Sequence, residues 1–130
     1  MPKRPHKLSE ASHAADRLSI RIDLASGSKI GPGKVAVLEQ IARTGSISAA
    51  GRTLKLSYKQ TWVLVDDLNQ SLGAAVVETA KGGGGGGGAV LTEVGKAVVN
   101  TYRAIEVDAV LAARKHISAL TRACPKIPPG

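Results

Sequence analysis

Apolar residues recur at every third or fourth position in two stretches of the first half of the chain. This spacing is typical of an amphipathic helix that packs one face on a core. We expect the first helix to end at Gly45, because glycine readily adopts the left-handed conformation that follows a helix. Ser46 then serves as the N-cap of a short second helix that runs through Leu54. The stripe of the first helix consists of Val35, Leu38, Ile41 and Ala42.

The second amphipathic stretch follows the brief connection Lys55–Leu56. Ser57 and Gln60 have the spacing of a capping box, in which each side chain satisfies a backbone N–H group at the helix start. Gly73 marks the end of this third helix. The position of Trp62 on its apolar stripe favours a core residue over a binding residue. That stripe consists of Trp62, Val65, Leu68 and Leu72.

Two regions show strand patterns instead. Residues 18–24 alternate between apolar and polar side chains, which predicts a half-buried strand before the first helix. The β-prone segment 74–79 and the segment Ala89–Leu91 flank a run of seven glycines. Two strands around a glycine loop predict a β-hairpin.

Thr92 is the expected cap of a last helix that runs from Glu93 to about Thr121. Its apolar surface is wider than one stripe and exceeds what a single small domain needs to bury. We therefore favour a dimer interface on this helix over packing against its own domain alone. The expected interface residues are Val98, Tyr102, Ile105, Ala109 and Ala112.

The element order is helix, short helix, capped helix, glycine hairpin and long helix. This order predicts a mainly α (α+β) fold: a winged helix-turn-helix with a short β-hairpin wing and a long C-terminal dimerisation helix. The expected organisation is a mobile N-terminal arm at 1–16, the winged domain at 17–92, the dimerisation helix at 93–123 and a flexible tail at 124–130.

The composition agrees with one packed domain that has an anionic partner. The 130 residues are 43% hydrophobic and 22% charged, and 18 Lys and Arg against 10 Asp and Glu give a net charge of +8. Nucleic acid is the first candidate partner and membrane headgroups are the second. The excess is spread evenly along the chain, so charge alone does not locate a binding face.

The expected setting is the cytoplasm. No apolar run approaches the roughly 20 residues of a membrane span, and the basic N-terminus is not followed by the apolar core of a signal peptide. A membrane-surface role also fails, because no helix combines a basic face with opposing Trp and Phe.

Enzymatic and cofactor roles find little support. The glycine run formally contains GxGxxG, but a strand rather than a helix follows it, and no GK[ST] motif is present. Cys124 has no His or acidic residue near it in sequence, and adjacent helix positions such as Asp66–Asp67 point about 100° apart. We expect no enzyme, no cofactor and no metal. A metal site would have to combine His6, His13 and Asp16.

The start of the third helix carries the strongest candidate chemistry, because the second helix of a helix-turn-helix enters the DNA major groove with its N-terminus first. Lys59 suits guanine or phosphate, and Gln60 suits adenine. Ser57 and Thr61 suit phosphates or base edges. Two alternatives stay open: the cap can occupy Gln60, and the ring of Tyr58 can pack rather than bind.

Phosphate contacts are expected around this helix. Ser46 and Ser48 start the preceding helix, whose free N–H groups attract phosphate. Arg52 and Lys55 add positive charge, and the glycines of the wing permit close approach to the sugar-phosphate backbone. The expected wing residues are Lys81, Gly82, Gly83, Gly84, Gly85, Gly86, Gly87 and Gly88.

Residues 33–99 resemble the N-terminal DNA-binding domain of the molybdate-responsive repressors (ModE-type), a branch of the LysR-like winged helices. The matching stretches are Glu39–Ser48, Leu56–Trp62, the glycine run Gly82–Gly88 and Ala89–Gly95. Each motif is weak alone, and their combination is specific.

The resemblance implies a sequence-specific transcriptional regulator that binds double-stranded DNA as a homodimer on a palindromic operator. It marks Ser57, Tyr58, Lys59 and Thr61 as contacts of the recognition helix and implies a link to molybdate transport or metabolism. The family's molybdate-binding module lies C-terminal to this domain, whereas this chain stops at Gly130, so we expect a stand-alone form. Two routes for molybdate stay open: it binds between two subunits, or another protein senses it. The alternative is a non-enzymatic protein-interaction or architectural DNA-binding module.

Overall fold

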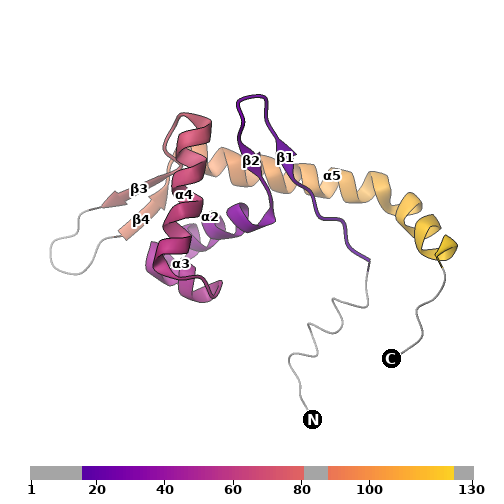
Figure 1. Ribbon diagram of the computed structural model, residues 1–130, viewed down its shortest axis with the longest axis horizontal. Helices are drawn as coiled ribbons and strands as arrows, with labels where there is room; N and C mark the ends of the chain where they lie inside the picture. Colours follow the sequence, from indigo (N-terminus) through magenta and orange to yellow (C-terminus); the bar gives the residue numbers. More distant parts are fainter. Residues whose placement is uncertain (1–15, 81–87, 125–130) are drawn as a thin grey trace, which may run out of the picture. The chain divides into compact units, whose positions relative to one another are not determined.

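The computed structural model describes residues 16–80 and 88–124 (Figure 1). The described residues pack as a larger unit, 19–105, and a smaller unit, 16–18 with 106–124. The elements in chain order are β1 (Ile22–Asp23), β2 (Lys29–Ile30), α2 (Pro32–Thr44), α3 (Ile47–Thr53), α4 (Tyr58–Leu72), β3 (Val77–Ala80), β4 (Gly88–Leu91) and α5 (Glu93–Ala123). The predicted fold class, a winged helix-turn-helix with a hairpin wing and a long last helix, is confirmed.

The helix ends follow their local sequence signals. Gly45 ends α2 with φ 73° and Gly73 ends α4 with φ 69°, both in the left-handed region. Ser46 caps α3 by accepting the Ala49 N–H at 3.0 Å. The Thr92 hydroxyl accepts an N–H in the first turn of α5 in the same way.

The strand predicted over 18–24 is wrong in extent. Only Ile22 and Asp23 pair, in antiparallel register, with Ile30 and Lys29. The ladder is short because a tight turn at Gly27, with φ 100°, returns the chain after Leu24, and α2 begins directly after β2. Alternation alone does not supply a partner strand.

The core of the larger unit forms where α2 packs against α3, α4 and β4. Ala42 was expected on the buried stripe of α2, but it is exposed, and Val37 is buried instead. Val37 is buried because partners on more than one side of α2 cover a face broader than one stripe; nothing in the structure explains the exposure of Ala42. The most buried apolar side chains are Val35, Leu38, Ile41, Val65, Leu68, Val76 and Tyr102.

The first half of α5 is tied to the larger unit by two polar contacts. The Tyr102 hydroxyl donates to the Ile20 carbonyl at 2.7 Å, and the ring is 1% exposed. Arg103 donates two hydrogen bonds to the Glu39 carboxylate, at 2.9 and 2.6 Å. These hydrogen bonds, together with the positive charge of Arg103, outweigh burial and lower the pKa of Glu39. Because its ring is buried and its hydroxyl is bonded to Ile20, Tyr102 packs within the larger unit.

Candidate nucleic-acid interface

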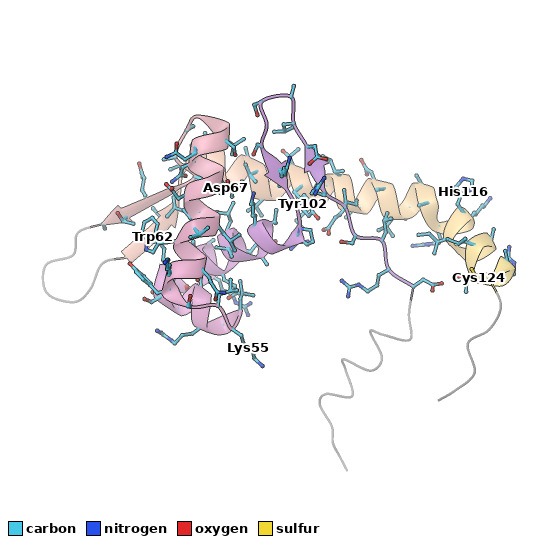
Figure 2. All side chains as sticks on the ribbon, viewed as in Figure 1. Lys55, Trp62, Asp67, Tyr102, His116 and Cys124 are labelled. Carbon is cyan, nitrogen blue, oxygen red and sulfur yellow. The ribbon has the colours of Figure 1, made fainter. Side chains whose placement is uncertain are left out.

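The connection between α3 and α4 is short and tightly packed. The Leu56 N–H donates to the Gly51 carbonyl at 2.8 Å, and Lys55 adopts a left-handed φ of 61°. A Cβ atom on Gly51 would collide with the Thr61 hydroxyl, so only glycine allows the two helices to approach this closely. This packing fixes the start of α4 relative to α3, and Lys55 points away from the connection (Figure 2).

The first turn of α4 presents a polar, exposed surface. Ser57, Tyr58, Lys59 and Gln60 are all exposed, as the sequence led us to expect. The Tyr58 ring is 58% exposed and rests edge-on against Trp62, with ring centroids 6.4 Å apart. Tyr58 is thus braced by Trp62 while most of its surface stays accessible.

Thr61 does not share this exposure. Its side chain is fully buried, and its hydroxyl donates to the Ser57 carbonyl at 2.8 Å. The sequence predicts that Thr61 contacts a phosphate or a base edge. This prediction is wrong, because the periodicity of the helix places residue 61 on the face of α4 that packs against α3. Its hydroxyl is not available to a nucleic acid, so Thr61 takes no part in the interface proposed below.

The capping box restricts what Gln60 can read. Its Oε1 accepts the Ser57 N–H at 2.8 Å, and the Ser57 hydroxyl accepts the Gln60 N–H at 3.0 Å. Bidentate recognition of adenine needs both the carbonyl and the amino group of the amide. While the cap is intact, one lone pair of Oε1 is occupied and the orientation of the amide is fixed at the helix start, so the amino group is the part of Gln60 that the cap leaves unengaged.

Ser46 and Ser48 differ in availability at the start of α3. The Ser46 hydroxyl is engaged as the cap and the residue is half-buried, whereas Ser48 is exposed. Ser48 is therefore the more accessible of the two hydroxyls.

The ion pairs in the structure show which basic side chains remain without an acidic partner. The number of charges along the sequence does not give this information. Within the described residues of the larger unit, four acidic side chains pair with basic ones: Asp23 with Arg21, Asp67 with Lys34, Glu93 with Lys96 and Glu39 with Arg103. Asp66 and Glu78 have no such partner there.

Among the described residues of that unit, the basic side chains without an ion-pair partner are Lys29, Arg43, Arg52, Lys55 and Lys59. All of them except Lys29 lie between the last turn of α2 and the first turn of α4. Arg43 was not among the sequence candidates, although its place just before the turn that joins α2 to α3 was a usable signal. The residual positive charge thus gathers on the helix-turn-helix.

The base of the wing is anchored beside this surface. β3 and β4 pair in antiparallel register from Val77 with Leu91 to Ala80 with Gly88. The Ala89 N–H donates to the carbonyl of Gly45, in the turn before α3, at 2.8 Å. Of the wing residues expected from the sequence, Gly88 is described by the structure. The other candidates, Lys81 and Gly82 to Gly87, lie outside the described residues.

The other candidate chemistry does not assemble in the described part of the chain. No group of His, Cys, Asp and Glu there has an arrangement suited to a metal ion. His6 and His13 lie outside the described ranges, and Cys124 is exposed. Among residues 16–80 and 88–124, no helix is long and apolar enough to cross a membrane.

Residues 33–96 match the family model of bacterial regulatory helix-turn-helix proteins of the lysR family. The molybdenum-pterin-binding protein MopB of Rhodobacter capsulatus is 51% identical over 81 residues, which are 62% of this chain and 30% of MopB. The transcriptional dual regulator ModE of Escherichia coli K12 is 41% identical over 71 residues, which are 55% of this chain and 27% of ModE. The chain thus spans less than a third of the length of these two relatives.

A solved structure shares the fold. The DNA-binding domain in the crystal structure of a CbnR–DNA complex superposes with a TM-score of 0.52 over 71% of this chain and 97% of that chain. The two sequences are 23% identical, so this similarity concerns the fold alone.

Proposed function

Residues 33–96 form a helix-turn-helix domain of the lysR family, and from this premise we propose that the protein is a non-enzymatic, sequence-specific DNA-binding transcriptional regulator acting in the cytoplasm. The observation that carries the proposal is the gathering of unpaired basic side chains at the turns joining α2, α3 and α4. Arg52, Lys55 and Lys59 surround the start of α4, the position from which a recognition helix enters the major groove.

The residues take two kinds of role in this proposal. Lys59, Tyr58 and the donor of Gln60 face base edges, with Ser57 at the helix start. Ser46 and Ser48 at the start of α3, Arg52 and Lys55 contact phosphates, and the structure adds Arg43 to this group. We also propose that the wing residues expected from the sequence, Lys81 and Gly82 to Gly88, contact the sugar-phosphate backbone.

The experiment that tests the proposal is repeated enrichment of bound duplexes from a random-sequence pool by the full chain. We expect one sequence with an inverted repeat to be enriched; it is called the selected duplex below. A pool that stays random after several rounds would contradict the proposal.

We propose that the second half of α5 carries the dimer interface. In the smaller unit, Val107 is 58% and Leu111 is 59% exposed, one helical turn apart. Of the interface residues expected from the sequence, Tyr102 is buried in its own unit, while Ile105 is 39% exposed and Ala112 is exposed. In a two-fold dimer, the two recognition helices would lie about 34 Å apart. This distance is one turn of DNA and matches the spacing between the two half-sites of an inverted repeat.

Replacing Leu111 by glutamate is expected to convert a dimer into a monomer, because a carboxylate would be buried in an apolar contact. Sedimentation velocity measures the change. The control His116→Glu places the same charge on an exposed, polar position of the same helix and is expected to leave the dimer intact. A monomeric wild type, or a dimeric Leu111→Glu, would contradict this assignment.

We also propose that the regulated genes serve molybdate transport or metabolism, on the basis of the similarity to the molybdenum-pterin-binding protein MopB. Deleting the gene is expected to change the transcript levels of molybdate-transport genes in a molybdate-dependent way. Unchanged transcripts at both low and high molybdate would separate this protein from the molybdenum-linked relatives.

A further inference from the structure

An aliphatic side chain, Val63, stands on the exposed face of α4. Its side chain is 56% exposed, whereas Thr61, Val65 and Leu68 of the same helix are buried. At about 100° per residue, Val63 lies nearly opposite the middle of this buried face. It therefore projects away from the core and gives the domain little packing energy.

The neighbours of Val63 place it at the end of the proposed DNA-contacting surface. Lys59 lies one turn before it and only about 40° around the helix axis. Asp66 and Asp67 follow in the next turn. Asp67 is paired with Lys34, whereas the carboxylate of Asp66 has no ion-pair partner among the described residues of the larger unit and disfavours close approach to phosphates. Val63 is thus the last side chain on this face before the acidic turn begins.

Valine at position 63 lowers the helix propensity of α4 and adds no residue to the buried core. A β-branched side chain has a lower helix propensity than alanine, and Val63 is not part of the buried core that would compensate for this. It also forms no hydrogen bond, so on a DNA-facing surface it contributes only through apolar contact. The major groove exposes one apolar group at base edges, the 5-methyl group of thymine.

We propose that Val63 contacts the 5-methyl group of a thymine in the major groove and is a specificity-determining residue of α4. The inference rests on the proposed DNA-binding function. Lys59 and Val63 lie one turn apart on α4, so we assign them to neighbouring base pairs within one half of the inverted repeat. Lys59 donates a hydrogen bond and Val63 recognises the methyl group that distinguishes thymine from cytosine and uracil.

The test compares the selected duplex with a copy in which uracil replaces every thymine, by fluorescence anisotropy at one salt concentration. The wild type is expected to bind the uracil copy about fourfold more weakly for each methyl group that Val63 touches in the thymine duplex. Val63→Ala is expected to bind the thymine duplex more weakly by about fourfold for each half-site that the protein occupies, and to bind both duplexes equally. The control Gln70→Ala, on the same exposed face beyond the acidic turn, is expected to keep the wild-type preference.

Three results would overturn this inference and leave the proposed function standing. The wild type could bind its selected duplex and the uracil copy equally, or Val63→Ala could show the same drop in affinity on uracil substitution as the wild type does. In the second case the methyl groups act through DNA shape or through another residue. If Val63 instead binds a protein partner, Val63→Ala leaves all DNA affinities unchanged, which also overturns it. Failure of the proposed function is separate: the pool yields no selected duplex, and both proposals fall.

Discussion

Replacing Gly95 by alanine is expected to lower the free energy of unfolding by about 2 kcal/mol, which corresponds to a fall in Tm of roughly 10 °C. An ideal Cβ on Gly95 would collide with the Val76 carbonyl oxygen and lie 3.1 Å from the Val76 carbonyl carbon. That carbonyl accepts the Thr92 N–H at 3.0 Å, so it cannot move aside without breaking the hydrogen bond. We expect the steric overlap of the new methyl group to destabilise the fold by about 3 kcal/mol. The better helix propensity of alanine offsets about 1 kcal/mol of this loss.

Gly33→Ala is the matched control, because a Cβ on Gly33 of α2 meets no atom within 4 Å. Thermal melts followed by circular dichroism are expected to show an unchanged or slightly higher Tm for this variant. A Gly95→Ala protein as stable as the wild type would mean that α5 and the segment before β3 are not in close contact.

Replacing Lys59 by alanine is expected to weaken binding to the selected duplex by about 1–3 kcal/mol, which is about 5- to 150-fold. Lys59 is exposed in the first turn of α4, has no ion-pair partner in the described part of the chain, and is placed to reach a base edge. Because a base contact depends on sequence, the effect is expected to be much smaller on a scrambled duplex. Fluorescence anisotropy with both duplexes measures the difference.

Arg52→Ala provides the comparison for Lys59→Ala. Arg52, in the last turn of α3, is proposed to contact a phosphate, so its removal is expected to weaken binding to both duplexes equally. It is also expected to reduce the slope of log K against log salt by about 0.9 for each bound subunit. If Lys59→Ala behaves in the same way as Arg52→Ala, Lys59 is a phosphate contact and does not read sequence.

The helix boundaries were predictable because their signals are local. Gly45 and Gly73 end helices through their own backbone conformation, and Ser57 with Gln60 forms a cap within one turn. The strand over residues 18–24 was overestimated because its length depends on a partner, and β2 is only two residues long. Local pattern does not contain this information.

The candidate site was predictable in position and less so in detail. Thr61 and Tyr102 have side chains that suit either a surface or a core, and their burial depends on α3 and on Ile20 respectively. The positively charged face was not predictable from charge counts, because the pairs Glu39–Arg103 and Lys34–Asp67 join residues far apart in sequence. Val63 could have been found, because it lies opposite the predicted apolar stripe of its helix.

The central claim is that the start of α4 reads DNA sequence, and the most direct test is the ratio of two dissociation constants. Fluorescence anisotropy of the full chain at one salt concentration compares the selected duplex with a scrambled duplex of the same composition. We expect the selected duplex to bind about a thousandfold more tightly or better. Equal affinity for the two duplexes would contradict the claim and indicate an architectural DNA-binding protein. No binding to either would favour a protein-interaction module.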